Sequence, residues 1–142
     1  MKWMPTDAQS GDMVRIQIGT LFHYGVFVSE DEVIQFGWPP VPEYADQNED
    51  IAVCAVDIDA FSCGRIVEVA VLDRKERKTR IPPEQTVKTA RARIGTGGYN
   101  MIHNNCEHFA YECVFGEKKS EQTEYIRNFW KKKFGQANTR WI

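Results

Sequence analysis

A cysteine at residue 106 stands where a chain commonly places a nucleophilic thiol. The stretch 104–109 reads N-N-C-E-H-F. Apolar residues then recur at helical spacing and predict one buried helix face, at Phe109, Ala110, Cys113 and Val114. Asn104 or Asn105 is a typical N-cap, and Gly116 is a typical C-terminal stop. Cys106 therefore falls in the first turn of a short helix, where unpaired amides and the positive end of the helix dipole favour a thiolate.

Such a thiol also needs a base and a polar group that orients the base. Of the three histidines, His108 lies two residues after Cys106, and residues i and i+2 of a helix do not face each other. His103 lies in the preceding linker. We favour His23, because a catalytic base is usually distant in sequence and is brought in by the fold. From spacing alone, a small core residue is the simpler interpretation of Cys106.

The region around His23 is predicted to form antiparallel strands. Alternation of apolar and polar residues predicts them at Met13–Ile18, Leu21–Val28 and Val33–Phe36. With a bulged three-residue loop after the second strand, Gly25 pairs with Gln35, and His23 and Gln35 become diagonal neighbours on one face. With a two-residue loop they would lie on opposite faces. The sequence leaves both registers open.

The rest of the chain alternates loops, strands and helices. Residues 1–12 are interpreted as a polar lead-in, and Trp38–Asp50 as a proline-rich loop that shapes a pocket. Strands are expected at Ile51–Ile58 and Arg65–Leu72, with a short turn at Asp59–Cys63 between them. A helix is predicted to open at Pro82-Pro83 and to bury Val87, Ala90, Ala92 and Ile94.

Two charged segments each allow two interpretations. The run Asp73–Arg80 is interpreted as a solvated hairpin or linker, and the alternative is contact with anionic lipid or phosphate. Residues 120–134 are predicted to form an amphipathic helix with an aromatic stripe. We expect this helix to dock on the core, and the alternative is peripheral membrane contact.

Composition limits the class of protein. The chain has 142 residues and a net charge of −2, which gives no argument for nucleic acid binding. Its start lacks a secretory signal, and it has no apolar run of about 18 residues. The spacing of the four cysteines matches no zinc pattern, so we expect reduced thiols, no metal and no cofactor. We expect a cytoplasmic protein, peripheral to a membrane at most.

Three stretches of the chain resemble one family. They are G-G-Y-N-M-I-H-N-N-C-E-H-F-A at 97–110, G-D-M-V-R-I at 11–16 and H-Y-G-V-F-V-S-E-D-E-V-I-Q-F-G at 23–37. Together they resemble the lecithin retinol acyltransferase-like family, over roughly residues 8–116. The resemblance implies an α+β, circularly permuted papain-like fold related to the NlpC-type peptidases. In that fold an antiparallel β-sheet packs against the cysteine-bearing helix and a second helix.

The resemblance also implies roles for individual residues. Cys106 becomes the nucleophile and His23 the general base. The family's third position, usually a second histidine, falls on Gln35, which can hold an imidazole by a hydrogen bond but cannot share its proton or carry charge. The backbone N–H of Cys106, at a helix N-terminus, is the expected oxyanion donor. Tyr24, Trp38 and Tyr44 are predicted to contact substrate.

The expected function is that of a thiol-dependent acyltransferase or acyl hydrolase with an acyl-cysteine intermediate, acting on lipid esters or amides. Residues 1–119 would form the catalytic domain and residues 120–142 a helical tail. Two alternatives stay open: a cysteine peptidase or amidase of the NlpC type, and a non-catalytic lipid-binding module, which Gln35 favours. The expected partner is an acyl-bearing small molecule or lipid.

Overall fold

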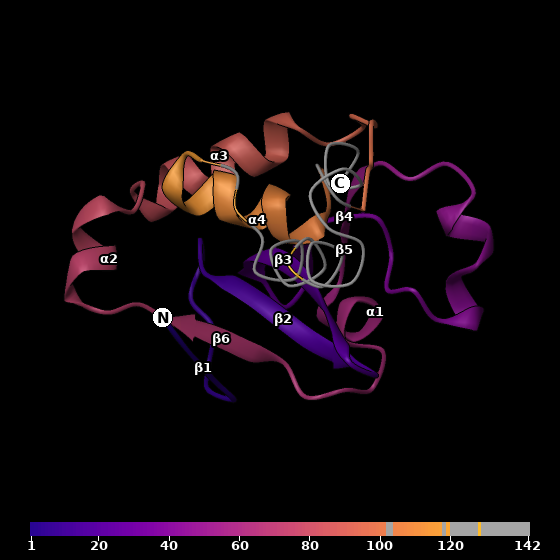
Figure 1. The fold of residues 1–142 in the computed structure, drawn as a ribbon, viewed down its shortest axis with the longest axis horizontal. Coiled ribbons are helices and arrows are strands. Elements are labelled where there is room, and N and C mark those ends of the chain that lie inside the picture. Colours follow the sequence, from indigo (N-terminus) through magenta and orange to yellow (C-terminus); the bar gives the residue numbers. More distant parts are fainter. Residues whose placement is uncertain (102–103, 118, 120–127, 129–142) are drawn as a thin grey trace.

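The computed structural model describes residues 1–101, 104–117, 119 and 128 (Figure 1). The predictions for His103 and for a helix at 120–134 lie outside these residues. None of the helices in the described part of the chain is long and apolar enough to cross a membrane.

An antiparallel sheet forms the centre of the described structure. Its six strands lie in the order β1-β6-β2-β3-β4-β5. The strands are β1 (Lys2–Met4), β2 (Met13–Ile18), β3 (Leu21–Ser29), β4 (Glu32–Phe36), β5 (Val53–Val56) and β6 (Glu68–Val71). The chain is thus α+β with an antiparallel sheet, as predicted.

Alternation along the strands buries both faces of the sheet. Tyr24, Val26 and Ile34 face helix α4 (Cys106–Phe115), and helix α3 (Pro83–Ala92) packs on α4 (Figure 1). Residues at odd positions of β4, such as Val33, face the opposite side, where Phe61 of helix α1 (Ile58–Ser62) is fully buried. The sheet therefore separates two apolar clusters, and the Cys106 helix covers one of them.

Helix α4 has the ends that its sequence predicts. Asn105 is the N-cap: its side chain accepts from the His108 amide, while the His108 side chain accepts from the Asn105 amide. At the other end Gly116 adopts a left-handed conformation with φ of 79°, which glycine takes without a Cβ clash. Helix α3 begins at Pro83, also as predicted, but its buried residues are Thr86, Val87 and Ala90. Ala92 and Ile94 were wrongly expected in the core and are exposed. Ala92 lies two residues after Ala90 and so faces away from it, and Ile94 lies beyond the end of the helix.

Two segments interpreted as irregular are regular structure. The lead-in contains β1, whose Trp3 pairs with Ala70 of β6 and so adds an edge strand to the sheet. The charge run forms helix α2 (Arg74–Thr79), started by a capping box in which Asp73 and Glu76 each bond to the other's backbone amide. The segment is solvent-exposed, as interpreted, but the expected hairpin or linker is wrong, because Asp73 and Glu76 in the charge run start a helix.

The remaining predicted elements are shorter in the structure than in the sequence pattern. Strands β5 and β6 occupy only the central parts of Ile51–Ile58 and Arg65–Leu72. Asp57 ends the first of these by capping α1. The loop between β4 and β5 contains two single turns of 3₁₀ helix, η1 (Pro42–Tyr44) and η2 (Asp46–Asn48).

Candidate active site

Cys106 reaches the sheet at the end of the β3–β4 pairing. The last pair of this ladder is Gly25 with Gln35, and Tyr24 lies next to it on β3, just beyond the paired stretch. The first turn of α4 occupies this place, and the backbone amide of Tyr24 interacts with the Cys106 sulfur there. The thiol thus sits at the junction of the helix N-terminus and a strand end.

His23 and Gln35 lie side by side in the sheet, as in the bulged register. A bulge between Phe27 and Ser29 shifts the hairpin so that Gly25 pairs with Gln35. His23 Nε2 then lies 2.9 Å from Gln35 Oε1. Both side chains are buried, and Gln35 has no exposed surface. The amide is therefore positioned to hold the imidazole in one orientation.

The orientation of the Gln35 amide determines which imidazole nitrogen carries the proton. Its Oε1 faces His23, and its Nε2 donates to the Cys54 sulfur at 3.6 Å from the neighbouring strand. A carbonyl oxygen only accepts, so His23 Nε2 must donate to it. In the neutral imidazole the remaining nitrogen, Nδ1, then has a lone pair and can accept a proton.

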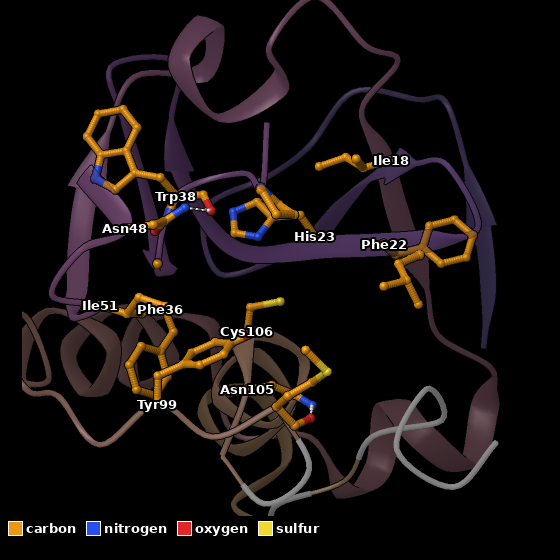
Figure 2. Close-up of a pocket in the computed structure, with 14 residues that line it drawn as sticks. Ile18, Phe22, His23, Phe36, Trp38, Asn48, Ile51, Tyr99, Asn105 and Cys106 are labelled. Carbon is orange, nitrogen blue, oxygen red and sulfur yellow. Dashed lines mark hydrogen bonds between the residues drawn. The ribbon is translucent and has the colours of Figure 1, made fainter. Parts of the chain in front are cut away.

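An apolar cavity of about 320 Å³ contains the thiol and the imidazole. Figure 2 shows Cys106 and His23 entering it from opposite walls, one from α4 and the other from β3. Most of the other lining side chains are apolar or aromatic: Ile18, Leu21, Phe22, Phe36, Ile51 and Tyr99. The loop after β4 contributes Trp38, Pro40 and Asn48.

Of the three side chains predicted to contact substrate, Trp38 lines the cavity and the two tyrosines do not. Tyr24 points to the other side of β3 from His23, and its ring packs against Trp3 with centroids 5.6 Å apart. The Tyr44 ring lies 4.8 Å from the Trp38 ring and supports it. Alternation along β3 thus puts the Tyr24 ring in the core, and Tyr44 contacts a lining residue.

Burial opposes the charged form of both candidate catalytic groups. It raises the pKa of Cys106 from 9.0 to about 11, although the amides of Tyr24, Glu107 and Cys106 lower it. Burial also lowers the pKa of His23 from 6.5 to about 4, against the raising effect of the Gln35 hydrogen bond. Burial therefore opposes the resting thiolate expected from the helix N-terminus: desolvation outweighs the helix amides and favours a neutral thiol beside a neutral imidazole.

The other candidate residues near Cys106 have structural roles. His108 Nδ1 accepts from the Asn105 amide at 3.1 Å and so completes the helix cap. Cys113 is fully buried among core residues. Sequence reasoning missed Asn48, whose side chain bonds to the backbone of Trp38. A signal was present, because asparagine in loops commonly bonds to nearby backbone.

The fold and this site define the class as an α+β protein with an antiparallel sheet, in which a cysteine at a helix start and a histidine on the sheet line one cavity. The family model described as lecithin retinol acyltransferase matches residues 6–119, and the chain belongs to that family.

Relatives from several mammals are similar to the chain. Lecithin retinol acyltransferase of Mus musculus is 24% identical over 132 residues, and that of Bos taurus is 24% identical over 132 residues. The Homo sapiens protein of the same name is 23% identical over 136 residues. Each match covers 80% of this chain and 57% of the relative.

Proposed function

We propose that the chain is a thiol-dependent acyltransferase or acyl hydrolase that acts on lipid esters or amides through an acyl-cysteine intermediate. One observation carries the proposal: Cys106 and His23 line the same apolar cavity, and Gln35 holds His23 by its Nε2 nitrogen. The names of the similar mammalian proteins support acyl transfer. We place the catalytic unit within residues 1–119, which contain all three groups.

The reaction would proceed in two half-reactions. His23 Nδ1 accepts the Cys106 thiol proton as the sulfur attacks the acyl carbonyl, and the tetrahedral intermediate collapses to a thioester. The leaving alcohol or amine departs with the proton from His23. An acceptor hydroxyl, amine or water then gives its proton to His23, attacks the thioester, and releases the thiol with that proton returned to sulfur.

Two features assist these steps. Because burial favours the neutral pair, proton transfer would accompany attack on the substrate instead of preceding it. The backbone N–H of Cys106 would donate to the oxyanion, since it lies at the helix N-terminus. Gln35 would keep Nε2 protonated throughout both half-reactions and would take no proton itself.

Covalent labelling by an activated acyl ester tests the proposal. We expect incubation with a p-nitrophenyl ester to add one acyl group to Cys106, detected by intact-mass and peptide mass spectrometry. Cys106→Ala should abolish the adduct without unfolding the protein. Cys63→Gly is the matched control, because it removes a thiol outside the site at a left-handed position that glycine accepts. An undiminished adduct on Cys106→Ala would refute the proposal.

A second function, a non-catalytic module that binds an apolar ligand, is favoured by the raised pKa of Cys106. Such a module would use the same cavity and form no thioester. Ligand binding without any acyl adduct on Cys106 would favour the module. An adduct that is passed to an added amine or to water would favour the enzyme.

A further inference from the structure

A single asparagine side chain closes the loop that forms one wall of the cavity. The Trp38 amide donates to Asn48 Oδ1 at 3.0 Å, and Asn48 Nδ2 donates to the Trp38 carbonyl at 3.1 Å. The Asn48 amide thus pairs with both backbone groups of one residue, as a neighbouring strand would. We call these two hydrogen bonds between Asn48 and Trp38 the clasp. Ten positions separate the two residues, so the clasp fixes the ends of the intervening loop.

The clasp fixes side chains that face the cavity. Trp38, Asn48 and Pro40 all line it, and Figure 2 shows the Trp38–Asn48 pair at the cavity wall. The preceding residue, Gly37, has a left-handed φ of 84°, which glycine adopts without strain, and a Cβ there would lie 3.0 Å from Ile51 Cγ2. Two hydrogen bonds from one side chain therefore help to position this wall, together with the Tyr44 ring against Trp38 and the bond from the Gly37 amide to the Ala52 carbonyl.

The opposite wall is apolar and belongs to the sheet. Ile18 comes from β2, and Leu21 and Phe22 come from β3; pairing of these two strands sets their positions. A methylene is similar in size to a water molecule, with a share of liquid volume of about 30 Å³. A cavity of about 320 Å³ accordingly has room for an alkyl chain of at most about ten carbons.

We propose that Asn48 is a specificity-determining residue, because its clasp on Trp38 sets the length of the alkyl chain that binds beside Cys106. This inference deepens the proposed function, in which the chain would be the acyl group. It can be tested without that function, since alkylation of Cys106 requires no acyl transfer.

The experiment measures alkylation of Cys106 by N-alkyl iodoacetamides with chains from methyl to tetradecyl, below the concentrations at which the probes aggregate. Each rate is divided by the rate of the same probe with glutathione. In the unmodified protein we expect a rise of up to about fourfold per methylene, which ends near ten carbons. Asn48→Ala should lower the decyl-to-methyl ratio at least tenfold and change the methyl rate less than twofold.

Two further variants make the result specific. Gln47→Ala is the matched control, since Gln47 is exposed in the same η2 turn and does not line the cavity, and its profile should equal that of the unmodified protein. Asn48→Asp keeps the acceptor for the Trp38 amide and loses the donor to the Trp38 carbonyl, so an intermediate profile is expected. Circular dichroism establishes that each variant is folded, and Asn48→Asp serves as the test if Asn48→Ala does not fold.

A flat chain-length profile in the unmodified protein would overturn the inference, and so would an Asn48 variant whose profile is unchanged. Failure of the proposed function looks different: no thioester forms from esters, while the chain-length profile and its dependence on Asn48 persist.

Discussion

The reactivity of Cys106 should show that burial, and not the helix N-terminus, dominates its ionisation. Iodoacetamide reacts with thiolate. With a pKa of about 11, on the order of one Cys106 in 10⁴ is ionised at pH 7, against about one in 100 for a thiol at the ordinary value of 9.0. A thiolate of higher pKa is more nucleophilic, with a Brønsted slope of about 0.4–0.5, so the greater reactivity of the Cys106 thiolate offsets roughly six- to tenfold of this loss in ionised fraction. We therefore expect Cys106 to react at least about tenfold more slowly than an exposed reference thiol at pH 7.

The pH dependence gives the sharper test. The rate should rise about tenfold per pH unit from pH 7 and keep rising beyond pH 9, because half-ionisation is reached only near pH 11. Peptide mass spectrometry at short reaction times gives the rate at Cys106 separately from the other three cysteines. Cys106→Ala supplies the background, and circular dichroism establishes the pH range in which the protein is folded.

Two results would refute this reasoning. One is a rate that levels off below pH 9, and the other is alkylation at pH 7 that is faster than that of the reference thiol. Either would mean that the amides of Tyr24, Glu107 and Cys106 stabilise the thiolate more than burial destabilises it.

Three further predictions concern the groups around the sulfur. The pKa of His23 is about 4 in the folded protein and 6.5 ordinarily, so the unfolded state binds more protons between these pH values. The free energy of unfolding should therefore fall by about 2 kcal/mol from pH 7 to 4.5. His23→Gln should reduce this fall in urea unfolding, and an equal fall in the variant would contradict the assignment. Gln35→Leu keeps the volume but leaves buried His23 Nε2 without its acceptor, so urea unfolding should show a loss of about 1–3 kcal/mol; an unchanged midpoint would argue against the hydrogen bond. His108→Gln retains an acceptor for the Asn105 amide whereas His108→Ala does not, so the alanine variant should be about 1 kcal/mol less stable in thermal or urea melts, and equal stabilities would exclude a capping contribution.

Local signals in the sequence predicted the ends of α4 and the strands of the hairpin, because capping and alternation act over a few residues, whereas the fold class followed from the family resemblance. Asn105 and Gly116 stop the helix by side-chain and backbone chemistry that the residue types show directly. The relation of His23 to Gln35 was predicted only conditionally. It depends on the bulge between Phe27 and Ser29, and turn residues did not decide that register.

Properties that depend on tertiary packing, such as the pKa of Cys106, could not be predicted from local sequence patterns. The helix N-terminus at Cys106 is a local feature, but the desolvation that raises its pKa comes from β3 and other distant segments. Helix α2 is a different case, since Asp73 followed three residues later by Glu76 is a capping box that the sequence displays. The prediction for this segment used its high density of charged residues and overlooked the capping box.

The lining of the cavity also restricts how a ligand can enter. Among the lining side chains in the described part of the chain there is no lysine, arginine, aspartate or glutamate. An ionic group drawn inside would give up its hydration with no countercharge to replace it. For the lipid substrate proposed above, we therefore expect entry tail first with the headgroup left in water, so that the bond presented to the sulfur lies at the junction of the apolar chain and the polar headgroup.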